Sequence, residues 1–309
     1  AMPSKPSPAR ALRQLRPSDL RGVARLATQA TAGISRVAEG VHQSVLGTMG
    51  LPGGTTPGRA GGLTGMVYGG VRGITRLVDA GLQAALLRLE PLLGVPGPAQ
   101  EAPRERLAVL AALNGVMGDR LAEDGNPLAT DMGFYQQGRP LDPAALGAAG
   151  TASGHLLVLV HGLCMNDLQW EHEGHDHGAH LAQALGCTPV YLRYNTGLHT
   201  STNGAELARQ LQALVAAWPV PLARLSLVGH SMGGLVARSA CHQAERAGLP
   251  WRSLLRHLVC LGTPHHGAPL ERAGHWVDRL LGSTPYSRPF ARLTGLRSAG
   301  ITDLRHGHV

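Results

Sequence analysis

Lysine, aromatic residues and paired cysteines are all scarce in this sequence. Lys5 is the only lysine among 309 residues, so the formal net charge of +8 comes almost entirely from arginine. The arginines are scattered at polar positions of helical patterns, and aromatic residues make up only 4% of the chain. A nucleic-acid-binding surface would need clustered basic residues with aromatics between them. The composition therefore argues against a nucleic-acid partner and predicts a core built from Leu, Val and Ala.

The cysteines and the apolar runs bear on the cellular compartment. Neither a disulfide-like nor a metal-like spacing is present among the four cysteines, Cys164, Cys187, Cys241 and Cys260. Three of them lie in or beside apolar runs, which favours buried free thiols in a reducing compartment. The sequence shows no apolar run typical of a signal peptide and no stretch of about 18 apolar residues able to cross a bilayer. We therefore expect a cytoplasmic protein.

Two hydrophobic patterns divide the chain. Over residues 10–122, apolar residues recur at steps of three and four between Gly/Pro-rich breaks, which predicts amphipathic helices. Residues 127–141 resemble a strand, a turn and a short return strand. From residue 155 onward, short apolar runs alternate with helical patterns, as in a mostly parallel sheet flanked by helices on both faces. We predict an N-terminal helical extension over residues 1–122 and an α/β core over residues 123–309.

The first chemical motif is Gly229-His230-Ser231-Met232-Gly233. It follows a predicted strand at residues 225–228 and opens a predicted helix at residues 235–247, which is the context of a nucleophile elbow. The turn strains the serine backbone and lifts the hydroxyl away from the sheet. A chance match in a glycine-rich chain is the alternative, and the flanking strand and helix disfavour it. We predict that Ser231 is the catalytic nucleophile and that the Met232 N–H is one oxyanion donor.

A second motif, His161-Gly162-Leu163, follows the predicted strand at residues 156–160. In an α/β-hydrolase, the turn after this strand provides the second oxyanion donor, which here is the N–H of Leu163. Removing one such donor typically costs about 3–4 kcal/mol of transition-state stabilisation. His161 itself is expected to support the turn and not to act as the general base.

A third motif, Gly262-Thr263-Pro264-His265-His266-Gly267, follows the predicted strand at residues 258–261. The three motifs, in this order and spacing, resemble bacterial lipases and esterases, in particular the group related to GPI inositol-deacylases (PGAP1-like). The resemblance covers residues 155–267, with less distinct likeness at residues 113–119 and 297–305. It implies an α/β-hydrolase that cleaves carboxylic esters, often with acyl chains, without a metal or organic cofactor.

The general base and its acid remain unassigned. In this fold the acid and then the histidine follow the serine along the chain, and we find no further strand after Gly267 to hold them. Three explanations stay open. The first, which we favour, is that the chain is C-terminally truncated before the last strands. The second is that Asp278 or Asp303 pairs with His306 or His308. The third is that acid–base chemistry has been lost from a retained scaffold.

The polar loop after the second motif offers candidate metal ligands. It contains Glu171, His172, Glu173, His175, Asp176, His177 and His180. Such side chains can bind zinc, but we favour a polar loop in which Asp176 caps the next helix, and we predict no metal. Asn166 and Asp167 either order this loop through side-chain hydrogen bonds or lie on the surface.

Together, these features predict a serine esterase or lipase that forms a covalent acyl-enzyme on Ser231 with a small-molecule or lipid ester. The alternative is a catalytically impaired α/β-hydrolase scaffold that binds a lipid or protein partner. The helical extension is expected to pack on the core. A lid or a peripheral membrane contact is the alternative for it, because Arg21, Arg25 and Arg36 face away from the apolar stripe.

Overall fold

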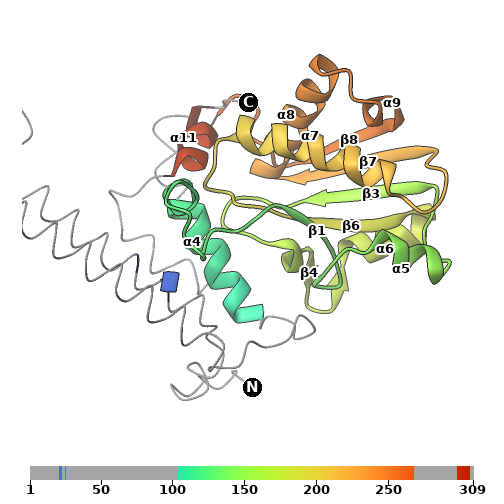
Figure 1. Ribbon diagram of the computed structural model, residues 1–309, viewed down its shortest axis with the longest axis horizontal. Helices are drawn as coiled ribbons and strands as arrows, with labels where there is room; N and C mark the ends of the chain where they lie inside the picture. Colours follow the sequence, from blue (N-terminus) through green and yellow to red (C-terminus); the bar gives the residue numbers. More distant parts are fainter. Residues whose placement is uncertain (1–20, 23–24, 26–103, 268–297, 307–309) are drawn as a thin grey trace, which may run out of the picture. The chain divides into compact units, whose positions relative to one another are not determined.

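The computed structural model describes residues 21–22, 25, 104–267 and 298–306 (Figure 1). Most of the predicted helical extension therefore lies outside the described residues, as do Asp278 and His308. The chain divides into two units, and residues 21–22, 25 and 126–128 belong to the smaller one. In that unit the Asn126 side chain donates to the Gly22 carbonyl at 3.2 Å and accepts from the Leu128 N–H at 2.9 Å. Every element described below belongs to the larger unit.

A six-stranded sheet organises the larger unit, in the order β2-β1-β6-β3-β7-β8. The strands are β1 (Gly133–Gln136), β2 (Arg139–Pro140), β3 (His155–Val160), β6 (Thr188–Arg193), β7 (Arg224–His230) and β8 (Leu255–Leu261). The last four run parallel to one another, while β1 pairs antiparallel with β2 and with β6. The predicted mostly parallel sheet and the predicted strand–turn–strand over residues 127–141 are confirmed.

Alternate side chains of the central strands enter two separate hydrophobic layers. In β3, whose six residues are all buried, Leu156 and Val158 face one layer and Leu157 and Leu159 face the other. A strand covered on both faces needs apolar residues at every position, which explains the continuous apolar run in the sequence.

Helices cover both faces of this sheet (Figure 1). On one face α7 (Thr200–Ala216) and α8 (Met232–Arg246) pack against each other and against the strands, and α6 (His177–Leu185) packs on the other. Short helices at α5 (Pro143–Ala148), η1 (Asp167–Trp170) and α9 (Trp251–Leu254), and a hairpin of β4 (Glu171–His172) and β5 (His175–Asp176), complete the connections. Helix α7 begins at Thr200, whose N–H donates to Asp303 Oδ2 at 2.7 Å.

Two further helices lie next to each other, α4 (Arg104–Glu123) and α11 (Ala299–His306). Val116 of α4 and Ile301 and Leu304 of α11 enter the main hydrophobic cluster. Helix α4 is kinked at Met117, where φ is −144° and ψ is 22°. Helix α4 belongs to the same unit as the sheet. The domain boundary near residue 122 stays a prediction. Among the described residues, no helix combines the length and apolar character needed to span a bilayer.

All four cysteines are free, as predicted. Cys164 and Cys187 are buried, whereas Cys241 and Cys260 are half-buried. Burial raises the pKa of the Cys164 thiol to about 12. A thiol of this kind is an unreactive part of the core.

Candidate active site

Ser231 connects β7 to α8 at a sharp bend. Its φ of 53° and ψ of −122° lie in a region that residues with a side chain rarely adopt, at a cost of about 1–3 kcal/mol. The Ser231 N–H donates to the Leu261 carbonyl of β8 at 2.8 Å, and the Ser231 carbonyl accepts from the Gly234 N–H at 3.1 Å. Two strands and a helix thus fix the bend, in the strand–turn–helix order that the sequence predicts.

Close backbone approach explains the glycines around Ser231. A Cβ added at Gly229 would lie 2.5 Å from the Gly234 Cα, and one added at Gly233 would lie 2.2 Å from the Val160 carbonyl oxygen. A Cβ at Gly234 would lie 2.0 Å from Thr263 Oγ1. The start of α8 therefore lies directly against the end of β3, and the third sequence motif, through Thr263, lies against the first.

The His161-Gly162-Leu163 turn contacts Ser231. A Cβ added at Gly162 would lie 3.1 Å from the Ser231 Cβ, so the two motifs meet at the carboxyl edge of the sheet. Leu163 and Met232 are both buried, and neither main-chain N–H donates a hydrogen bond to a described residue. Main-chain donors without a described partner, in turns that meet at a serine, are a chemical arrangement that can bind an oxygen that gains negative charge.

The Ser231 hydroxyl is buried and has no hydrogen-bond partner among the described residues. No described histidine or carboxylate therefore holds it as a base would. Asp303, one of the acids considered from the sequence, accepts from His199 Nδ1 at 3.1 Å and from the Thr200 N–H; its pairing with His306 or His308 stays a prediction. The side chains of His306 and His308 lie outside the described residues.

His161 is fully buried beneath the turn that it begins. Its ring stacks on Tyr194 with centroids 4.5 Å apart, and its Nδ1 lies 3.0 Å from the Gly162 carbonyl oxygen, to which it donates. The Tyr194 hydroxyl in turn donates to the His161 carbonyl at 2.8 Å. Burial lowers the pKa of His161 to about 3, so the ring is neutral at pH 7. These contacts fit a supporting role for His161 in the turn.

This buried histidine should make stability depend on pH. Between pH 3 and 6.5 the unfolded chain binds a proton at residue 161 that the folded chain does not bind. The free energy of unfolding should therefore be fully retained above pH 6.5 and fall as the pH falls, with a slope from this residue of up to about 1.4 kcal/mol per pH unit. Urea unfolding between pH 7 and 4 should show a shallower slope in His161→Asn. The exposed His242→Asn should keep the wild-type slope, and equal slopes in all three proteins would contradict the prediction.

Asn166 and Asp167 order the loop after the turn, which settles the alternative left open by the sequence. Asn166 Oδ1 accepts from the Leu168 N–H at 3.0 Å, and the Asn166 N–H donates to Gln169 Oε1 at 2.9 Å. The buried Asp167 carboxylate accepts two hydrogen bonds from the Arg193 guanidinium, at 2.5 and 3.0 Å. A bidentate pair of this kind fixes both position and orientation.

The histidine-rich run forms the β4–β5 hairpin and the start of α6. Asp176 caps α6 as predicted, accepting from the Ala179 N–H at 2.9 Å, and it also accepts from the Tyr191 hydroxyl. The ring centroid of His175 lies 5.0 Å from that of His177 and 5.2 Å from that of His180. In the described part of the chain, no group of three or more His, Cys, Asp or Glu side chains is arranged to hold a metal ion.

A cavity of about 630 Å³ runs along the face of the sheet that carries α6. Apolar side chains of three strands line most of it, among them Leu157, Val228 and Val259. His230 and Leu261 line its end at the carboxyl edge, and these two residues respectively precede Ser231 and bind its N–H. Ser231, Leu163 and Met232 do not line it, so among the described residues the cavity reaches the neighbours of the serine and not the serine itself.

The turn after β6 contributes buried polar residues that no sequence motif indicated. Asn195 and Thr196 are buried there, and Thr196 Oγ1 accepts the Cys164 N–H at 3.2 Å. The only indication of this turn in the sequence is the polar Asn195-Thr196-Gly197, which comes shortly after a largely apolar run. Carboxyl-edge loops of parallel sheets commonly carry site residues.

Comparison with known proteins agrees with the motif analysis. The family model described as the PGAP1-like alpha/beta domain matches residues 151–280. Among curated proteins, none matches the sequence. Among solved structures, the mature form of the Bacillus licheniformis lipase BlEst2 is similar at 22% identity with a TM-score of 0.35, over 49% of this chain and 55% of the lipase. The propeptide form of the same lipase is similar at 25% identity with a TM-score of 0.36, over 49% of this chain and 30% of that protein.

The matched regions are partial. This chain spans about half the length of the mature lipase and less than a third of the propeptide form. The predicted resemblance and the predicted fold class are confirmed by the family match and by the parallel sheet with its flanking helices. Residues 151–280 are thus similar to the PGAP1-like alpha/beta domain, and the described strands and helices have the arrangement of an α/β-hydrolase fold.

Proposed function

We propose that this protein is a serine hydrolase that cleaves carboxylic esters. The observation that carries the proposal is the strained bend at Ser231, which lies against the turn that begins with His161 and Gly162. The main-chain N–H groups of Leu163 and Met232, which follow in these two turns, have no hydrogen-bond partner among the described residues. Ser231 Oγ attacks the ester carbonyl carbon and loses its proton to a base. The N–H groups of Leu163 and Met232 bind the resulting oxyanion. The alcohol then leaves with a proton, and water hydrolyses the acyl-enzyme to release the acid and restore the serine.

The proposed substrate is an ester with an apolar acyl chain. The mostly apolar cavity that ends at His230 and Leu261 supports this choice. The chemistry requires neither a metal nor an organic cofactor. The cytoplasmic location and a peripheral membrane contact through the N-terminal helices stay predictions.

A fluorophosphonate probe tests the nucleophile directly, because it phosphonylates an activated serine and loses fluoride. We expect the wild-type chain to be labelled and Ser231→Ala to remain unlabelled. Ser239→Ala is the matched control and should still be labelled, since Ser239 is a buried serine of α8 that does not line the cavity. Labelling that persists in Ser231→Ala would refute the assignment of the nucleophile.

The second candidate function is a catalytically impaired scaffold that binds a lipid or protein partner. One observation favours it: the Ser231 hydroxyl has no hydrogen-bond partner among the described residues, whereas an active serine needs a base. Protein expressed from the complete open reading frame that unfolds cooperatively yet is not labelled would support the scaffold. Labelling of the folded wild-type chain would exclude it.

A further inference from the structure

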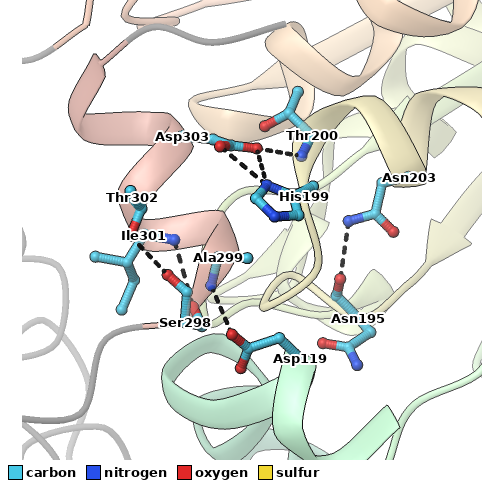
Figure 2. Close-up of polar contacts among 10 residues, drawn as sticks. All are labelled: Asp119, Asn195, His199, Thr200, Asn203, Ser298, Ala299, Ile301, Thr302 and Asp303. Carbon is cyan, nitrogen blue, oxygen red and sulfur yellow. Dashed lines mark hydrogen bonds and ion pairs between the residues drawn. The ribbon is translucent and has the colours of Figure 1, made fainter. Parts of the chain in front are cut away.

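The first of the two weaker sequence motifs, residues 113–119, and the described residues of the second, 298–305, meet at the turn formed by residues 195–199 (Figure 2). From α4, the Gly118 carbonyl accepts from Asn195 Nδ2 at 2.8 Å. At the start of α11, the Gly300 N–H donates to the Gly197 carbonyl at 3.0 Å. The two helices are also bonded to each other, because the Ala299 N–H donates to Asp119 Oδ2 at 2.9 Å. The turn is thus held by two helices that are far apart in the sequence.

Asp303, one turn further along α11, bonds to the last residue of the same turn and to the first residue of α7. Its buried carboxylate accepts from His199 Nδ1 and from the Thr200 N–H (Figure 2). One turn further along α7, Asn203 Nδ2 donates to the Asn195 carbonyl at 2.9 Å. Each end of the 195–199 turn therefore has a side-chain partner from a helix.

One hydrogen bond connects this turn to the candidate site. Thr196 Oγ1 accepts the N–H of Cys164, the residue that follows Leu163. Cys164 has a positive φ of 58°, an unfavourable conformation for a residue with a side chain. The packing behind it is tight, since a Cβ added at Gly115 of α4 would lie 2.2 Å from the Cys164 Sγ. The hydrogen bond that Thr196 Oγ1 accepts thus holds Cys164 in a strained conformation, immediately after the residue that carries the Leu163 N–H.

We propose that Thr196 is the positioning residue of the oxyanion turn. Because α4 and α11 hold the 195–199 turn, their positions determine, through Thr196, where the Leu163 N–H lies. The proposal rests on the proposed ester hydrolysis. A site of this kind needs its donors held within about 0.5 Å of the productive position. Because Thr196 does not itself act on the substrate, its loss should misplace one donor and leave substrate binding nearly intact.

Thr196→Val removes the hydroxyl and keeps the shape of the side chain. Removing an oxyanion donor outright costs about 10²–10³-fold in kcat. For a displaced donor we expect a smaller loss, about 10-fold in kcat on a short-chain p-nitrophenyl ester, with KM changed less than about twofold. Thr196→Ser keeps the acceptor oxygen and should restore most of the activity.

Thr188→Val is the matched control. Thr188 is another buried threonine, at the opposite end of β6, and its Oγ1 accepts the Ser153 N–H at 2.8 Å. It should lose stability as Thr196→Val does but keep the wild-type kcat. An unchanged kcat in Thr196→Val, or an equal loss in Thr188→Val, would overturn the proposal.

Hydrogen exchange separates this proposal from the proposed function. If the Thr196 hydroxyl holds the turn, the Cys164 amide should exchange faster in Thr196→Val than in the wild type and in Thr188→Val. Unchanged exchange refutes the tether even in an active enzyme. Faster exchange in a chain that no fluorophosphonate labels would support the tether and refute the proposed function instead.

Discussion

Replacing Ser231 by alanine is expected to abolish ester hydrolysis and to leave the fold intact. Loss of a catalytic serine lowers kcat on the order of 10⁶-fold. Alanine keeps the Cβ at the bend and removes only the hydroxyl, which has no hydrogen-bond partner among the described residues. We therefore expect turnover of a p-nitrophenyl ester to fall to background, while the free energy of unfolding in urea changes by less than about 1 kcal/mol.

A comparison of Ser231→Gly with Ser231→Ala isolates the backbone strain, because both variants lack the hydroxyl. At an ordinary helical position glycine is about 1 kcal/mol less stable than alanine. At a φ of 53° the order should reverse, because the Cβ of alanine strains this backbone conformation and glycine has no Cβ. Glycine less stable than alanine at this position would show that the bend is not strained and would remove the main support for the proposed nucleophile.

The parts of the fold that could be predicted are those whose cause is local. The continuous apolar run of β3 indicates that this strand is buried on both faces. The glycines around Ser231 indicate the close approach of α8 to β3. The start of α7 could not be predicted, because the group that accepts the Thr200 N–H is Asp303, which is 103 residues away in the sequence. A capping partner at that separation leaves no periodic signal.

The residues of the candidate site also fall into those with a local sequence signal and those without one. Ser231, Leu163 and Met232 belong to short motifs, so their placement at one edge of the sheet follows from the order of strands and turns. Thr196 has no motif of its own, and its bond to the Cys164 N–H depends on β6 lying beside β3 in the sheet. The missing base is a different case, because no described side chain bonds to Ser231 and the sequence offers no motif for one.

Gly233→Ala is expected to cause a large loss of stability, although alanine is the better helix former. At a helical position with space for a methyl group, this change stabilises a protein by up to about 1 kcal/mol. In α8 the added Cβ would lie 2.2 Å from the Val160 carbonyl oxygen and 2.5 Å from that of His161. Both contacts are with backbone atoms of a buried strand end, so no side-chain rotation relieves them. Helix α8 must move away from β3, and we expect a loss of about 3 kcal/mol or more in urea unfolding.

Moving α8 also moves Ser231 and the Met232 N–H away from the Leu163 N–H, so fluorophosphonate labelling should fall together with stability. Gly174→Ala provides the control, because Gly174 has a positive φ of 81° and open space around it. There only backbone strain opposes the change, and about 1 kcal/mol should be lost with no effect on labelling. If Gly233→Ala were as stable as the wild type, the close approach of α8 to β3 would be wrong, and with it the placing of Met232 beside the oxyanion turn.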